Sequence, residues 1–218
     1  MLSADFVVSG NRSAGSVVVR SSLSPISLQA ARRRIDQLKA ALKSAVAAST
    51  DFLMTHDVEV SLTWFVEEDV RYQTHTAADL DNVLKPLFDA CAGVNGIMID
   101  DNQVQSIKAS WETPGAFGPG FELVFQSLLR DDTVTRAGTA FVEFAPNACY
   151  ILPGIQPEFW VDLVSMYRIY RDKRAEMLDL GVDPSALAGL APNTRPWHSQ
   201  RLRLQGFDVL PADSFGTT

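Results

Sequence analysis

Residues 78–108, ADLDNVLKPLFDACAGVNGIMIDDNQVQSIK, predict a helix, a tight loop and a strand in close succession. Apolar side chains recur at helical spacing over residues 79–91, and the glycines of GVNG then end the helix. Residues 104–112 favour a strand after the loop. Because the chain turns back on itself here, we expect the start of the strand to return toward the helix.

Five charged side chains of this stretch are candidates for one site: Asp79, Asp81, Lys85, Asp100 and Asp101. Carboxylates gathered together repel one another unless a cation holds them. Ligands that are all oxygen suit Mg²⁺ or Mn²⁺, and the absence of nearby His or Cys argues against zinc. Lys85 follows Asp81 by four residues and shares its helix face, where an ammonium could either stabilise the charge that builds during phosphodiester cleavage or position the attacking water.

The same residues also have an ordinary structural interpretation. Asp79 is a good helix N-cap, Asp81 complements the helix dipole, and an Asp81–Lys85 pair adds a few tenths of a kcal/mol. Asp-Asp-Asn is common turn composition. From residue types and spacing alone, the metal site and the capped helix with its turn both remain open.

The whole chain has the composition of a globular protein. Its 218 residues are 46% hydrophobic and 21% charged, enough for one ample domain or one domain with an extension. Cys91 and Cys149 lie in apolar segments, so we expect both to be reduced in a cytoplasmic protein. No apolar run approaches the ~18 residues of a membrane span, and we expect neither a secretory signal nor a membrane partner.

The formal net charge of −7 is distributed unevenly. Residues 1–50 carry 7 Lys and Arg against 2 Asp and Glu, whereas residues 51–129 carry 3 against 13. The acidic block contains the candidate metal ligands, and bound cations would offset part of it. Net charge therefore weakens a role in DNA binding without excluding it.

The remaining patterns predict an α+β fold with a small mixed sheet and two helices, in the order β-α-β-α-β-β. We expect strands at 16–20, 57–65, 104–112 and 121–125, the last two forming a hairpin, and a helix after a Ser27 cap over 28–46. We place the domain at residues 1–129. Residues 130–218 are expected to form a C-terminal extension of unknown role, with a strand near 139–144, a long helix over 157–180 and an irregular tail.

The pair of motifs DLDNVLK and DDNQV resembles the RusA family of Holliday-junction resolvases, whose pattern runs D-x-D-N-x-x-K and then D-D-x-Q-V. Residues Asp79, Asp81, Asn82 and Lys85 match the first part, and Asp100, Asp101, Gln103 and Val104 match the second. Asp89-Ala90 also fits the acidic and small pair that the family carries late in the helix. The resemblance extends loosely over residues 16–128.

The resemblance implies a homodimeric, Mg²⁺-dependent endonuclease, with Mn²⁺ as a possible substitute, that nicks paired strands of branched DNA such as four-way junctions. By position, Asp79, Asp81 and Asp101 would be catalytic carboxylates and metal ligands, and Lys85 the catalytic lysine. Asp100 is the second choice for the role given to Asp101. The family's proline-rich N-terminal segment is absent, and the residues after 129 have no counterpart in compact members. These departures bear on DNA contacts, substrate choice and the dimer.

Basic residues in the helix after Ser27 are the candidates for phosphate contact: Arg32, Arg33, Lys39 and Lys43. A charged helix face that is merely solvated is the competing interpretation. Two other functions remain open for the whole chain. One is a non-catalytic DNA- or protein-binding module on the same fold, and the other is a related nuclease that acts on flaps or other DNA.

Overall fold

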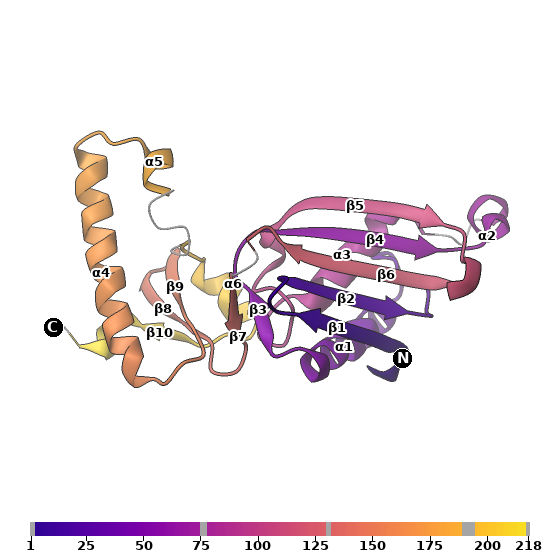
Figure 1. The fold of residues 1–218 in the computed structure, drawn as a ribbon, viewed down its shortest axis with the longest axis horizontal. Helices are drawn as coiled ribbons and strands as arrows, with labels where there is room; N and C mark the ends of the chain where they lie inside the picture. Colours follow the sequence, from indigo (N-terminus) through magenta and orange to yellow (C-terminus); the bar gives the residue numbers. More distant parts are fainter. Residues whose placement is uncertain (1–2, 75–77, 130–131, 189–194, 217–218) are drawn as a thin grey trace. The chain divides into compact units, whose positions relative to one another are not determined.

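The computed structural model describes residues 3–74, 78–129, 132–188 and 195–216, and the chain divides into two compact units, Met1–Thr133 and Val134–Thr218. Each unit combines helices with strands, which confirms the α+β class (Figure 1). In the described ranges, no helix is both long enough and apolar enough to cross a membrane.

The first unit is built on a five-stranded mixed sheet in the order β1-β2-β6-β4-β5. Strand β4 is parallel to β5 and antiparallel to β6, and the other neighbours are antiparallel. The strands are β1 (Phe6–Asn11), β2 (Ser16–Ser21), β4 (Val58–Phe65), β5 (Val104–Glu112) and β6 (Gly120–Ser127).

Helices α1 (Arg32–Ser49) and α3 (Leu80–Cys91) lie on the same face of this sheet (Figure 1). The strand facing them follows the predicted alternation, since Val58, Val60 and Leu62 are almost completely buried while the residues between them are not. The shared core fixes α3 against β4, and α3 is the crossover that makes β5 parallel to β4.

Shorter elements complete the first unit. The short helix α2 (Glu68–Gln73) follows β4. The others are η1 (Ser3–Asp5), β3 (Phe52–Met54), η2 (Asp101–Gln103), η3 (Gly115–Phe117) and β7 (Thr133–Thr135), which spans the division between the units.

Three details of this unit differ from the sequence predictions. Strand β1 was not expected, and the Val7 side chain on this edge strand is 68% exposed, so little apolar alternation marks it. The predicted hairpin of the last two strands is wrong, because β4 lies between β5 and β6. Helix α1 begins at Arg32 rather than near Leu28. The Ser27 hydroxyl caps a turn instead, accepting the backbone N–H of Gln29.

The second unit has a three-stranded sheet in the order β10-β8-β9 and a long helix. Helix α4 matches the expected long helix to within one residue at each end, and its Val164 and Tyr167 pack with the sheet in a separate core. The elements are β8 (Ala140–Ala145), β9 (Ala148–Leu152), α4 (Glu158–Asp179), α5 (Pro184–Ala188), α6 (Ser199–Leu204), β10 (Val209–Pro211) and η4 (Ala212–Phe215).

The tail predicted to be irregular contains regular structure. Strand β10 pairs in parallel with β8, and Leu202 of α6 and Phe207 are buried. These elements are three to six residues long, too short for their periodicity to stand out from a sequence rich in Pro, Ser and Gly.

Candidate active site

Helix α3 begins at the candidate acidic pair. Asp79 occupies the N-cap position but its side chain makes no capping hydrogen bond, and Asp81 is exposed in the first turn. Neither carboxylate has a hydrogen bond or ion pair with another residue in the part of the chain that the structure describes. Neither carboxylate therefore caps the helix among the described residues, and both are available to a ligand.

The loop after α3 returns the chain to the side of the helix. Its amides at Ile97 and Met98 both bond the carbonyl of Cys91, at 2.7 and 3.2 Å. A Cβ on Gly96 would lie 2.3 Å from that same carbonyl oxygen, so only glycine permits the turn. The fully buried Ile97, Met98 and Ile99 then anchor the segment that leads to the second acidic pair.

The two aspartates of that pair have different surroundings. Asp100 is 3% exposed, and its carboxylate accepts the backbone N–H of Asn102 at 3.1 Å as the N-cap of η2. The side chain of Gln103 completes a capping box by accepting the backbone N–H of Asp100. Asp101, only partly buried, extends its carboxylate to Lys85 instead. The geometry favours Asp101 over Asp100 as the residue available for chemistry.

Gln103 holds the loop in place from inside the protein. Its amide oxygen accepts the backbone N–H groups of Ile99 and Asp100, at 2.7 and 3.1 Å. Its amide nitrogen donates to the carbonyls of Met54 and His56, at 3.0 and 2.6 Å. The side chain is 1% exposed and all of its polar capacity is used. The glutamine of the DDNQV motif is thus the residue that positions Asp101.

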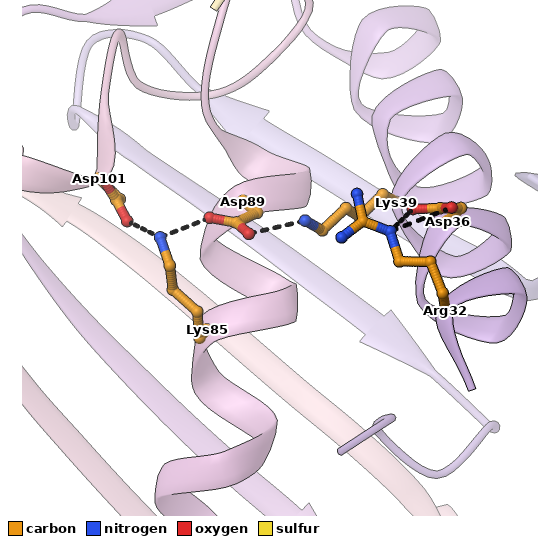
Figure 2. A network of polar contacts seen from close by, with 6 residues as sticks. All are labelled: Arg32, Asp36, Lys39, Lys85, Asp89 and Asp101. Carbon is orange, nitrogen blue, oxygen red and sulfur yellow. Dashed lines mark hydrogen bonds and ion pairs between the residues drawn. The ribbon is translucent and has the colours of Figure 1, made fainter. Parts of the chain in front are cut away.

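Lys85 is the centre of a chain of four alternating charges, which Figure 2 shows. Its ammonium contacts Asp101 Oδ2 at 2.5 Å and Asp89 Oδ1 at 2.6 Å. The other oxygen of Asp89 accepts a hydrogen bond from Lys39 on α1 at 2.7 Å. Asp89 therefore bridges the two helices and holds Lys85 from the side opposite Asp101.

The charge chain shifts the proton equilibria of its members. Burial lowers the pKa of Lys85, but the hydrogen bonds and charges of Asp101 and Asp89 outweigh burial and raise it above the ordinary value. Burial by itself would raise the pKa of Asp89. The hydrogen bonds from Lys39 and Lys85 outweigh burial, so the pKa of Asp89 is below its ordinary value. Lys85 is therefore a fixed positive charge at neutral pH.

The metal prediction can be compared with these contacts. No group of three or more His, Cys, Asp or Glu side chains lies close enough to hold one metal ion in the described ranges. Asp101 is paired with Lys85, whereas Asp79 and Asp81 have no partner there. The oxygen-only donors suit Mg²⁺, but as placed they do not form a complete set, so the assignment of Asp79, Asp81, Asp100 and Asp101 as ligands stays a prediction.

The four predicted phosphate contacts on α1 have different surroundings. The Arg32 guanidinium bonds Asp36 one turn later, at 3.1 and 3.3 Å, and Lys39 is engaged by Asp89 (Figure 2). Lys43 is partly buried, and burial lowers its pKa. Arg33 is exposed and has no partner among the described residues. DNA contact by these residues stays a prediction.

Asp89 and Gln103 were not among the predicted site residues, although Gln103 lies in the DDNQV motif and Asp89 in the acidic and small pair late in the helix. The D-x-x-Q spacing of residues 100–103 is a capping-box signature that predicts the local role of Gln103. The contact between Lys39 and Asp89 joins residues fifty positions apart, and local spacing carries no signal for it.

Comparison with known proteins agrees with the geometry of this region. No curated protein matches the chain. The model of the family described as endodeoxyribonuclease RusA matches residues 21–120. This range contains α1, α3, the loop and η2, and so includes the whole charge chain. Residues 21–120 of the chain are therefore similar to the RusA family of endodeoxyribonucleases.

Proposed function

We propose that this protein is a structure-selective endodeoxyribonuclease that resolves four-way DNA junctions by paired nicks and depends on Mg²⁺, with Mn²⁺ as a substitute. The family match supports DNA cleavage, since RusA enzymes are endodeoxyribonucleases. The observation that carries the proposal is the position of Lys85. It lies one turn after Asp81 on α3 and is held between the carboxylates of Asp89 and Asp101.

Lys85 would supply positive charge to the phosphate during cleavage. Its raised pKa keeps the ammonium protonated at neutral pH, so it cannot act as a general base. Two hydrogen bonds fix its direction before substrate arrives, and a preorganised cation stabilises developing charge without reorganisation. Asp89 serves as a positioning residue, because it retains Lys85 if Asp101 turns toward another cation.

The carboxylates account for the proposed metal. In phosphodiester hydrolysis a divalent cation supplies an activated water and neutralises charge on the phosphate. Asp79 and Asp81 would hold it with uncommitted oxygens, and Asp101 would join them by exchanging its contact with Lys85. The acidic composition of residues 51–129 is consistent with a cation bound in this part of the chain.

A homodimer would explain paired nicking, because a four-way junction presents two equivalent strands related by two-fold symmetry. Strand β5 is at the edge of the sheet, and its Ile107 side chain is 52% exposed. An exposed edge strand with an apolar side chain is a common pairing surface. Sedimentation of the purified protein tests this part of the proposal. A monomer at the concentrations that cleave would contradict it.

The test of the activity is nicking of a synthetic four-way junction. We expect wild-type protein with Mg²⁺ to nick two opposing strands, and Asp81→Asn to be slowed at least a hundredfold. The matched control is Asp51→Asn, the same change at an exposed aspartate outside the site. Equal cleavage by wild type and Asp81→Asn would disprove the assignment. Junction binding without cleavage in either metal would favour a non-catalytic module, and faster cleavage of flaps would favour the related nuclease.

A further inference from the structure

A pocket of about 490 Å³ opens in the first unit next to the start of α3. Its volume is within the range of small-molecule sites, roughly 300–1,000 Å³. The apolar lining comes from Pro25, Ile26, Trp64, Val66, Val70 and Ala78. The other described lining residues are Ser24, Ser27, Gln29, Ala30 and Arg34, so the pocket combines polar and apolar groups. No carboxylate is among the described lining residues.

The pocket is coupled to the candidate active site through the backbone. Ala78 lines it and immediately precedes Asp79. The turn that forms another wall is tied to α3, because the backbone N–H of Leu28 donates to the carbonyl of Asn82 at 2.7 Å. A group bound in the pocket would therefore lie close to any phosphate that Asp79 and Asp81 approach.

The aromatic wall of the pocket is closely packed. Trp64 is 4% exposed and stacks on Trp111 of the neighbouring strand, with ring centroids 4.5 Å apart. The Arg71 guanidinium covers Trp111 at 5.0 Å and Tyr72 at 4.7 Å. The buried indole N–H of Trp64 has no acceptor among the described residues.

Arg34 is the one cation among the described residues that line the pocket. Arg34 is exposed, and no hydrogen bond or ion pair occupies it in the described part of the chain. This distinguishes it from Arg32, which bonds Asp36 on the same helix. A cavity that combines apolar side chains with hydroxyl and amide groups and one guanidinium complements a flat heterocycle that carries hydrogen-bonding groups next to a phosphate.

We propose that this pocket receives one nucleobase, unstacked at the branch point of the DNA substrate, while Arg34 contacts the adjacent phosphate. This inference rests on the proposed function, because it assumes that branched DNA is the substrate. Bases at a branch point are already partly freed from stacking, so extruding one costs less than in a duplex. Every base presents an acceptor, so the pocket selects for branch structure more than for sequence.

The test is an abasic scan in the absence of divalent cations, so that binding is measured without cleavage. Fluorescently labelled four-way junctions carry one abasic residue at successive positions around the branch, and affinity is measured by anisotropy. We expect wild-type affinity to fall about tenfold at one symmetry-related position and little elsewhere, the size of a lost base stacking contact.

Two pairs of variants assign that effect to the pocket. Val70→Trp fills it from a partly exposed position on α2, whereas Gln73→Trp adds the same ring at an exposed position outside the lining. We expect Val70→Trp to weaken binding of the intact junction about tenfold and to abolish sensitivity to the abasic residue. Gln73→Trp should keep both the wild-type affinity and the sensitivity to the abasic residue. Arg34→Ala should reduce that sensitivity at least threefold, and Gln37→Ala, at an exposed position of α1 outside the lining, should leave it unchanged.

The outcomes separate this inference from the proposed function. If wild type cleaves junctions with Mg²⁺ but no abasic position matters, or if Val70→Trp keeps the wild-type sensitivity, the pocket proposal is overturned alone. If the abasic position matters and Val70→Trp removes the effect while no cleavage occurs in Mg²⁺ or Mn²⁺, the pocket stands and the nuclease assignment fails. Absence of junction binding by wild type overturns the pocket proposal.

Discussion

Replacement of Asp89 by Asn tests whether the charge chain both stabilises the first unit and positions Lys85. The carboxylate of Asp89 is 27% exposed and bonds Lys39 and Lys85 at 2.7 and 2.6 Å. Partly exposed ion pairs contribute roughly 0.5–1 kcal/mol each, so losing both costs about 1–2 kcal/mol in free energy of unfolding. For a unit of this size the midpoint of thermal unfolding should fall by about 4–7 °C.

The pH dependence of that loss has a definite sign. The pKa of Asp89 is lowered below its ordinary value of 3.8 in the folded protein. Its contribution is therefore present above that value and disappears as the pH falls through the lower folded pKa. Urea unfolding of wild type and Asp89→Asn, followed by tryptophan fluorescence, should differ at pH 7, and the difference should be smaller at a pH below 3.8. A difference of the same size at both pH values would refute the electrostatic explanation.

Single-turnover cleavage at saturating enzyme separates the effect of Asp89 on the position of Lys85 from its effect on the stability of the first unit. Asp89→Asn should slow cleavage about tenfold, because Lys85 loses the bond that holds it from one side. Lys39→Met removes only the outer pair and leaves Lys85 bonded to Asp89, so it should lower stability but leave the rate within about twofold. If Lys39→Met slows cleavage as much as Asp89→Asn does, Asp89 does not act through Lys85.

Three further expectations concern buried groups. Gln103→Ala would remove the hydrogen-bond partner of four backbone groups, three buried and one partly buried, and should cost at least about 3 kcal/mol in urea unfolding. Asn102→Ala, at an exposed position, should cost under about 0.5 kcal/mol. Burial raises the pKa of Tyr167 to about 12, so its phenol should resist ionisation at pH 11 when followed by absorbance, and stability should fall as the pH rises above 10. Burial also raises the pKa of both thiols, so Cys91 and Cys149 should react with a thiol reagent only on unfolding; reaction in the native state would contradict their placement.

The sequence predicted the helices and strands in which apolar residues recur at a regular helical or strand spacing. The apolar side of α3 and the alternation of β4 identify those elements, and α4 is long enough for its boundaries to be located. Strand β1 escaped prediction because it is at the sheet edge with Val7 facing solvent. The neighbours of β5 could not be inferred from chain order, because the crossover through α3 placed β4 between β5 and β6.

Prediction of the candidate site was limited by long-range contacts. Spacing placed Asp81 and Lys85 on one helix face, and the DDNQV motif pointed to Asp101. The turn around Gly96 brings Asp101 against Lys85 because the backbone approaches this glycine closely. The presence of a glycine in the sequence does not predict which backbone atoms will approach it. The role of Asp89 depends on how α1 packs against α3, which is decided by the whole core.

The buried amide of Gln103 has a consequence for how this site responds to its surroundings. The backbone of the loop that carries Asp101 is held by the neutral side chain of Gln103, whereas the carboxylate of Asp101 forms an ion pair with Lys85. High salt weakens partly exposed ion pairs far more than enclosed neutral hydrogen bonds. Ionic strength should therefore loosen Lys85 from Asp101 while the backbone of the loop stays in place. The protein can exchange charged partners on its surface without rebuilding the support underneath.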